Sequence, residues 1–444
     1  MSQSASVTRR SFLRISGAAA AGLALAACAP AAPSPAGGAE SAQPAAEPVQ
    51  LSLSVVDYVD ETRTLLSDTV LPAFSEAHPG ATVSVNYTNW ERYNEEMTTA
   101  FAGGVTPDIF QGGAVWSPQM AQRGWCLPLD DLLANASESW NWDDFFPALQ
   151  DDSTINGQIV SIPYRIDIRS FWYRKDHLEE AGFSEPPTNW EELEAMAVAC
   201  TKREGDQITR EGYHYSSPGG WQNDLQAYMP FMEMAGGQFL SDDLSHCTLA
   251  EDPAVEALEF IHKLIVDLKV QPYPGFEAQG DLGPLEAGIA AATIGAAQIE
   301  RNARTYAPDQ LEHLWPTLPL THNVQATHVW VNKYFISKLT KNPEMSWQLL
   351  ETLTSADVLS DYCEGAAFTP PRRSLGEAEF MTERAKILLD STEYAVPFPK
   401  HHRLIELFRP LATNLEKCYR QELSPADAMA ATAAEVDALL QESA

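Results

Sequence analysis

The feature that most constrains the fold is an alternation of strand and helix patterns between residues 51 and 110. Residues 51–56 alternate polar and apolar side chains and then turn apolar, which predicts a strand. Two further strands are predicted at 82–87 and 107–110, and helices at 66–77 and 91–102. Because the order strand, helix, strand, helix, strand favours parallel pairing with right-handed crossovers, the sequence predicts an α/β fold.

Later helices are marked by their start signals. Residues 188–191, Thr-Asn-Trp-Glu, fit a capping box in which the Thr188 hydroxyl accepts from the amide of Glu191 and that carboxylate reaches back. Asp252 and Asn342 each precede a proline, which is typical of the first turn of a helix. The sequence therefore predicts three helices that begin at these positions.

The first 28 residues have the features of an export signal. A twin arginine, Arg9 and Arg10, precedes an apolar run at 17–26 that is too short to span a membrane. Residues 25–28, Leu-Ala-Ala-Cys, resemble the lipobox of bacterial lipoproteins, which implies cleavage before Cys28 and acylation of its thiol. We expect a protein anchored by lipid to the outer face of the cell membrane or in the periplasm. The alternative is an ordinary signal with a chance cysteine.

The charge of the chain excludes one class of function. The formal net charge is −32, and removal of the signal would take away three arginines and no acids, which leaves −35. Nucleic-acid binding draws on clustered cations, whereas 61 acidic residues here outnumber 29 lysines and arginines. We therefore expect no nucleic-acid partner, and we attribute the acidity to solubility outside the cell.

Residues 29–49 consist almost wholly of Ala, Pro, Ser, Gly, Gln and Glu. Such a composition cannot bury enough apolar surface to offset the entropy of ordering, so it predicts a disordered tether. The remaining residues suffice for two globular lobes.

Cysteine and histidine spacing argues against a metal centre. Beyond Cys28 the chain has five cysteines, which are Cys126, Cys200, Cys247, Cys363 and Cys418. None forms a CxxC motif and no histidines stand at zinc-ligand spacing, so we expect neither a metal nor another cofactor. An odd number leaves at least one free thiol, which makes any disulfide optional.

Several short blocks of sequence carry a resemblance to a known family. One is Ala-Gly-Gly-Val-Thr-Pro-Asp at 102–108, which precedes the third predicted strand. Others lie at 74–83, 124–130, 156–164, 172–182, 186–193 and 369–373. In this order they resemble the extracellular solute-binding proteins of ATP-binding-cassette importers, in particular the carbohydrate-binding branch, from residue 51 to the C-terminus.

The resemblance implies an architecture and a function. The fold would be the two-lobed, maltose-binding-protein-like type II fold, with a hinge and an interlobe cleft. Residues 50–165 and 316–342 would form the N-lobe, and residues 166–315 and 343–444 the C-lobe. The protein would be a monomeric lipoprotein without enzymatic activity. It would capture a sugar or oligosaccharide in the cleft and deliver it to the permease subunits of the transporter.

Candidate ligand-binding residues follow the predicted strands. Ligands in open α/β sheets bind beyond the carboxyl ends of the strands. Asp57 and Tyr58 follow the first strand, Trp90 the second, and Gln111 and Trp116 the third. A sugar offers apolar faces and a rim of hydroxyls, so aromatic rings and planar polar groups of this kind suit it.

The first predicted crossing between lobes, 162–167, supplies a charged pair. Arg165 and Asp167 could both bind hydroxyl groups through charge-assisted hydrogen bonds. The alternative is an ion pair of Asp167 with Arg165 or Arg169 that only fixes the hinge.

Three further candidates carry equally open alternatives. Trp221 occupies the position of a cleft aromatic in many relatives, but core packing would explain it as well. Trp330 stands where the family more often has a glycine-rich loop, so it could stack on the sugar or fill space. Arg372 follows two prolines that stiffen the chain, and it could face the cleft or the solvent. Residues 293–297 lack an aromatic that relatives often carry there.

Two other functions stay open at this point. The same fold could bind a polyamine, a peptide or another small cation through Asp57, Asp60 and Asp167. An exported glycosidase is the other alternative, although the chain has no GxSxG, HExxH, GxGxxG or P-loop motif.

Overall fold

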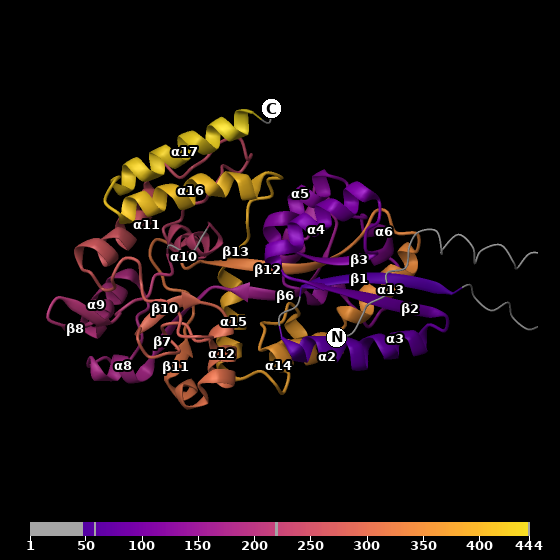
Figure 1. Cartoon of the computed structure of the whole chain (residues 1–444), viewed down its shortest axis with the longest axis horizontal. Helices are drawn as coiled ribbons and strands as arrows, with labels where there is room; N and C mark the ends of the chain where they lie inside the picture. The colour runs from indigo at the N-terminus through magenta and orange to yellow at the C-terminus, as the bar shows by residue number, and fades with distance from the viewer. Residues whose placement is uncertain (1–47, 57–58, 218–220, 443–444) are drawn as a thin grey trace, which may run out of the picture. The chain divides into compact units, whose positions relative to one another are not determined.

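A computed structural model describes residues 48–56, 59–217 and 221–442 of the chain (Figure 1). The predicted signal, Cys28 and nearly all of the predicted tether lie outside the described residues. Within the described part, no helix combines the length and the apolar character needed to cross a membrane.

The three predicted strands are neighbours in a six-stranded sheet. Strands β1 (Val49–Val56), β2 (Ala81–Thr88) and β3 (Ile109–Gly113) pair in parallel, which confirms the sequence prediction. Helical connections α2 (Asp60–Thr64), η1 (Leu65–Val70), α3 (Leu71–Ala77) and α4 (Trp90–Gly103) join them. The order is β13-β12-β3-β1-β2, and β6 pairs with β12. Leu51 and Leu53 are fully buried, as expected for a strand with neighbours on both sides.

Strand β12 (Thr327–Ile336) returns to this sheet late in the chain. It runs antiparallel to β3 on one side and to β6 (Ile162–Ile168) on the other. All ten of its residues are buried. The short strand β13 (Ala395–Val396) pairs with its beginning.

Helices α13 (Pro343–Leu353) and α14 (Ala356–Ala366) pack against the same sheet. Leu349, Leu350 and Leu353 share one buried cluster with Leu51 and Leu53 of β1. The sequence prediction assigned these helices to the second lobe. They lie against the first sheet instead, because their apolar faces are buried together with β1. The other predicted lobe boundaries remain predictions.

A second, three-stranded sheet has the order β10-β7-β11 and is antiparallel. Its strands are β7 (Ser170–Arg174), β10 (Ala292–Gly295) and β11 (Leu314–Pro316). The helices of this half are α8 (Lys175–Glu180), α9 (Trp190–Cys200), α10 (Trp221–Met234), α11 (Asp252–His262), α12 (Gln298–Tyr306), α16 (Leu404–Tyr419) and α17 (Pro425–Gln441). Figure 1 shows α16 and α17 beside α10 and α11, and buried side chains of these helices share one core cluster.

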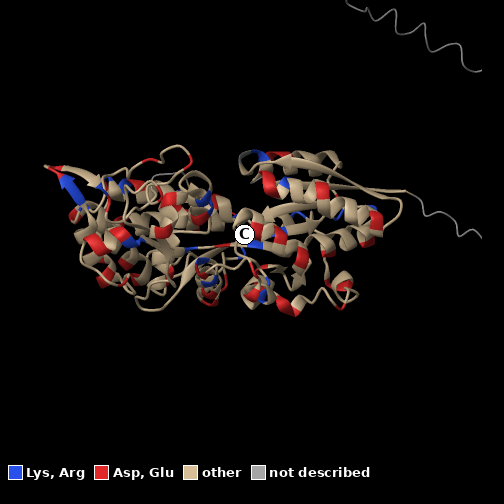
Figure 2. Cartoon of the chain, turned by 90° about the horizontal axis from the view of Figure 1, so that it is seen from below, with Lys and Arg blue, Asp and Glu red and all other residues tan. Residues whose placement is uncertain are grey.

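Short elements complete the described chain. Between β3 and β6 they are η2 (Ala114–Trp116), α5 (Ser117–Gln122), α6 (Asp130–Leu133), η3 (Trp142–Asp144), α7 (Pro147–Asp152), β4 (Thr154–Ile155) and β5 (Gln158–Ile159). Later ones are β8 (Lys202–Glu204), β9 (Gln207–Arg210), η4 (Lys263–Asp267), η5 (Pro308–His313), η6 (Arg373–Glu377), α15 (Glu383–Asp390) and η7 (Ser391–Tyr394). Figure 2 shows acidic residues distributed over helices and loops throughout the chain.

The start of α9 corrects the predicted capping box by one residue. Asn189 is the N-cap, and its side chain accepts from the amide of Glu192 at 2.9 Å. The Thr188 amide and hydroxyl both donate to the Glu192 carboxylate at 2.8 Å. Trp190 begins the helix because its ring is buried and stacks on Phe260, which fixes the register of the first turn.

Candidate ligand-binding site

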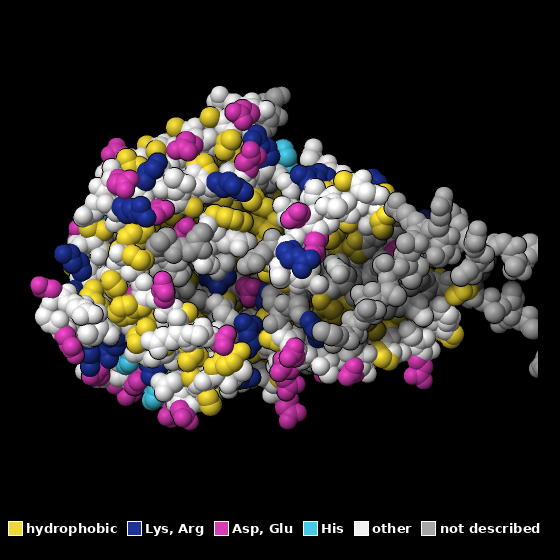
Figure 3. Space-filling view, viewed as in Figure 1, with side chains coloured by type: hydrophobic (Ala, Val, Ile, Leu, Met, Phe, Trp, Pro, Cys, Tyr) yellow, Lys and Arg dark blue, Asp and Glu magenta, His cyan; other side chains and the backbone are white. Residues whose placement is uncertain are grey.

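A cavity of about 240 Å³ lies where elements of the two sheets meet, and we call it the central pocket. Its lining residues are Trp90, Gly113, Trp116, Arg165, Asp167, Arg169, Gln222, Gln226, Gln298, Arg301, Trp330, Val331 and Asn332. They come from α4, β3, η2, β6 and β12 of the first sheet region and from α10 and α12 of the second, except Arg169, which lies between β6 and β7. Figure 3 shows basic and acidic side chains together in the hollow near the middle of this face.

Indole rings form the apolar part of the central pocket. Trp90 and Trp116 stack with their ring centroids 5.1 Å apart and their planes within 3°. Gly113 allows this arrangement, since a Cβ atom there would lie 2.9 Å from the Trp116 ring. Trp330 packs edge-on against Phe398 with the centroids 4.6 Å apart. The sequence predicted all three tryptophans as ligand contacts, and the structure places them in one pocket.

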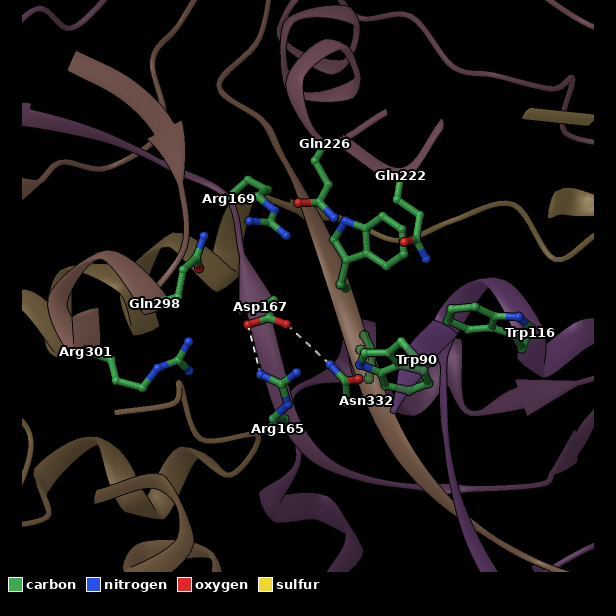
Figure 4. A pocket seen from close by; sticks show the side chains of 13 residues that line it. Trp90, Trp116, Arg165, Asp167, Arg169, Gln222, Gln226, Gln298, Arg301 and Asn332 are labelled. Atoms are coloured by element: carbon green, nitrogen blue, oxygen red, sulfur yellow. Dashed lines mark hydrogen bonds and ion pairs between the residues drawn. The ribbon is translucent and has the colours of Figure 1, made fainter. Parts of the chain in front are cut away.

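The predicted charged pair lies in the same pocket (Figure 4). Arg165 donates from Nη1 to Oδ1 of Asp167 at 3.1 Å, and Asn332 donates to Oδ2 at 3.5 Å. The Arg165 guanidinium also lies 4.1 Å from the ring centroid of Phe368. The two alternatives that the sequence left open for Asp167 therefore coexist: it is ion-paired, and it lines the pocket.

The sequence prediction missed all four of the side-chain amides among the described lining residues, which are Gln222, Gln226, Gln298 and Asn332. Gln222 and Gln226 are four residues apart on α10, so they share one face of the helix. Gln298 and Arg301 are three residues apart on α12 and share a face likewise. The only signal in the sequence was polar pairs at helical spacing, which is typical of any solvated helix face.

Arg169 connects the two sheets. It is the single residue between β6 and β7, which belong to different sheets. Its amide donates to the carbonyl of His328 at 3.0 Å, and its own carbonyl accepts from the Thr327 hydroxyl. Its guanidinium lines the central pocket although the residue is only 7% exposed. The sequence considered Arg169 only as an ion-pair partner of Asp167.

Three predicted residues do not line the central pocket. Gln111 is buried, accepts from the amide of Val56 at 2.7 Å and donates to the Tyr334 hydroxyl at 2.9 Å, so it ties β1 to β12. Trp221 packs against the core, with its centroid 6.4 Å from that of Phe408.

Arg372 is the third of these residues and is 1% exposed. Its guanidinium donates to the Thr354 carbonyl at 2.8 and 3.0 Å and to the Asp144 carboxylate at 3.1 Å. It also lies 4.2 Å from the ring centroid of Phe145. These contacts connect distant loops and leave no face for a ligand. The remaining two predicted residues, Asp57 and Tyr58, lie outside the described part of the chain.

The geometry defines a class of protein. Stacked indoles, four side-chain amides and a guanidinium–carboxylate pair meet in one cavity between two α/β regions. Such a cavity suits a small polar solute with an apolar face, because rings cover the face and planar groups pair with the polar rim.

Comparisons with known proteins agree with this class. The family described as bacterial extracellular solute-binding protein matches residues 61–359. A binding protein of Brucella abortus (strain 2308) is 22% identical over 399 residues, which cover 88% of this chain and 93% of that protein. A solute-binding protein of an ABC transporter from Thermotoga lettingae TMO, bound with alpha-D-tagatose, has a TM-score of 0.75 at 24% identity, with 88% and 99% of the chains covered. The cyclic alpha-maltosyl-1,6-maltose binding protein of Arthrobacter globiformis has a TM-score of 0.76 at 21% identity, covering 89% and 100%.

The family match spans more than half of the chain, so this protein belongs to the bacterial extracellular solute-binding proteins. The two solved structures show the shared fold. The predicted fold class, an α/β fold of the maltose-binding-protein type, is thereby confirmed.

The contacts of Arg372 generate a prediction. Arg372→Ala should lower the free energy of unfolding by about 3–5 kcal/mol, because it leaves the Asp144 carboxylate and the Thr354 carbonyl without their buried donor. Urea unfolding followed by circular dichroism measures this loss. The neighbouring Arg373→Ala serves as the control, since Arg373 is exposed. A loss equal to that of the control would contradict the structural role of Arg372.

Proposed function

We propose that this protein binds a carbohydrate in the central pocket and delivers it to the membrane permease of an ATP-binding-cassette importer. The observation that carries the proposal is the combination of three indoles with amide, guanidinium and carboxylate groups in one cavity. The indole faces match the C–H faces of a sugar ring, and the planar polar groups match pairs of hydroxyls. A micromolar affinity would correspond to about 8 kcal/mol, which a few such contacts can supply.

The relatives support a sugar as ligand. The Thermotoga lettingae protein has alpha-D-tagatose bound. The Arthrobacter globiformis protein is a binding protein for cyclic alpha-maltosyl-1,6-maltose. Both cover almost nine tenths of this chain. A sugar in the central pocket of this protein would contact side chains from both sheets, and it would therefore favour the arrangement in which both sets of contacts are made.

The alternative of a cationic solute has less support. Among the described residues that line the central pocket, three are arginines and only one, Asp167, is an acid. A polyamine would meet repulsion there rather than neutralisation. Asp60, which the sequence also offered for this role, does not line the pocket.

A glycosidase reaction has no basis in the described lining residues either. That chemistry needs two carboxyl groups flanking the bond that is cleaved, about 5–9.5 Å apart. The described lining residues supply the single carboxylate of Asp167. The proposal therefore includes the absence of enzymatic activity, and binding without turnover of the sugar is what it requires.

The proposed place of work is outside the cytoplasmic membrane. The family is extracellular, and the twin-arginine signal with Cys28 at its end supports a lipid anchor. The anchor would hold the pocket near the permease.

Calorimetry against a panel of neutral and acidic mono- and disaccharides tests the proposed ligand class. Trp90→Ala should weaken the binding of every sugar about tenfold or more, because a stacking face is lost, and Asp167→Asn should do the same for a neutral sugar, whose hydroxyls lose a charged acceptor. Matched controls are Trp315→Ala and Asp309→Asn, since neither residue lines the central pocket. No binding by any sugar, or equal affinities in all four variants, would contradict the proposal.

Replacement of the anchor residue gives a separate prediction. Cys28→Ser should move the protein from the membrane fraction to the soluble extracytoplasmic fraction, because no thiol remains to be acylated. Immunoblotting of cell fractions measures the shift. A variant that stays with the membrane as fully as the wild type would rule out anchoring through Cys28.

A further inference from the structure

The described residues that line the central pocket have a net charge opposite to that of the chain as a whole. The full sequence has a formal net charge of −32. In contrast, the described lining residues comprise Arg165, Arg169 and Arg301 against one acid, Asp167. Random placement in so acidic a protein would favour carboxylates, so this concentration of arginines calls for a physical reason.

Arg169 is the guanidinium with the least compensation. Its residue is only 7% exposed, and its Nε has no hydrogen-bond partner in the described part of the chain. No carboxylate of the described residues lies within 4 Å of it, whereas Arg165, Arg174 and Arg372 each have one. Burial lowers the pKa of Arg169, Asp167 opposes that effect and Arg165 adds to it. A buried cation without a hydrogen-bonded carboxylate is costly, and a bound anion would reduce that cost.

Asp167 is already engaged elsewhere. Its carboxylate accepts from Arg165 at 3.1 Å and from Asn332 at 3.5 Å, on the side of β12. The backbone of Arg169 is meanwhile fixed by hydrogen bonds to His328 and Thr327, so its side chain starts from a rigid position. Arg165 has a structural ion pair with Asp167, and Arg169 has no such pair with a described carboxylate. Arg169 instead presents a charge to the pocket.

The arrangement of groups suggests how a ligand would lie. In Figure 4 the guanidinium groups of Arg165, Arg169 and Arg301 are grouped around Asp167, and the rings of Trp90 and Trp116 lie toward the opposite side. A ligand that spans this pocket would therefore place one end among cations and another over indoles.

We propose that the solute is an acidic carbohydrate, whose carboxylate or phosphate group accepts hydrogen bonds from Arg169 while its ring packs on Trp90 and Trp116. This inference rests on the proposed function and adds the charge of the ligand to it. Guanidinium groups pair with carboxylates and phosphates through two parallel hydrogen bonds, which neutral hydroxyls match less strongly. Within the pocket an acid would also be attracted by the local positive charge of the described lining residues, although the net charge of the protein repels anions at long range.

Matched sugars separate this inference from simple sugar binding. The probes are glucose, glucuronate and glucose 6-phosphate, together with galactose and galacturonate, measured by calorimetry at about 20 mM and about 500 mM salt. An acidic sugar should bind at least about tenfold more tightly than its neutral counterpart, and its affinity should fall with salt. The uronates and the phosphate ester distinguish a carboxylate from a phosphate as the preferred group.

Variants of Arg169 test the residue itself. Arg169→Gln should remove most of the preference for the acid and its salt dependence, whereas Arg169→Lys should retain part of both because it keeps the charge. Arg203→Gln on the β8–β9 hairpin makes the same charge change outside the pocket and should leave both unchanged. Thermal unfolding checks that each variant is folded, and the salt dependence of the wild type tests the inference without any variant.

The outcomes distinguish the two levels of the proposal. Neutral sugars that bind as tightly as their acids, without salt dependence, would overturn the acidic ligand and leave the carbohydrate-binding function standing. Acid preference that survives Arg169→Gln unchanged would overturn the role of Arg169. No binding by any of the five probes would count against both.

Discussion

The antiparallel pairing of β6 with β12 is the interaction on which the rest of the site depends. Its register places Asp167 opposite Trp330 and Arg165 opposite Asn332. A shift of one residue would turn these side chains to the other face of the sheet, because successive residues of a strand alternate. Lys333 of β12 is fully buried and donates to the Asp152 carboxylate of α7 at 2.5 Å, which ties β12 to that helix as well. The polar floor of the pocket is therefore built by the sheet rather than by loops.

Strand β6 leads directly into β7 of the second sheet, and Arg169 is the residue that joins the two strands. The backbone of Arg169 is held by β12, through the His328 carbonyl and the Thr327 hydroxyl, so its side chain can present a charge with little loss of entropy on binding. The acidic exterior and the arginine-rich pocket then have separate roles. The exterior keeps the protein soluble, and the pocket provides a local reversal of the field that discriminates between solutes.

Sequence reasoning located the parts of the site that local pattern determines. Trp90 and Trp116 could be predicted because each follows a recognisable strand, and strand ends converge at one edge of a sheet. Asp167 was predicted from the crossing between lobes that the family resemblance implied. Arg372 could not be placed in this way, since its partners Asp144 and Phe145 are more than two hundred residues away in the chain. Gln222 and Gln226 were missed because a polar pair on a helix is usually solvated. The assignment of α13 failed for a similar reason: its apolar face is plain from the sequence, but the sheet that it covers is not.

A crystal structure of the protein with a bound acidic sugar would test the central claim most directly. The account predicts electron density for the ring against Trp90 and Trp116, with the acidic group within about 3 Å of the Arg169 guanidinium. Density for the sugar at any other place, or a sugar in the central pocket with its acidic group turned away from Arg169, would contradict it.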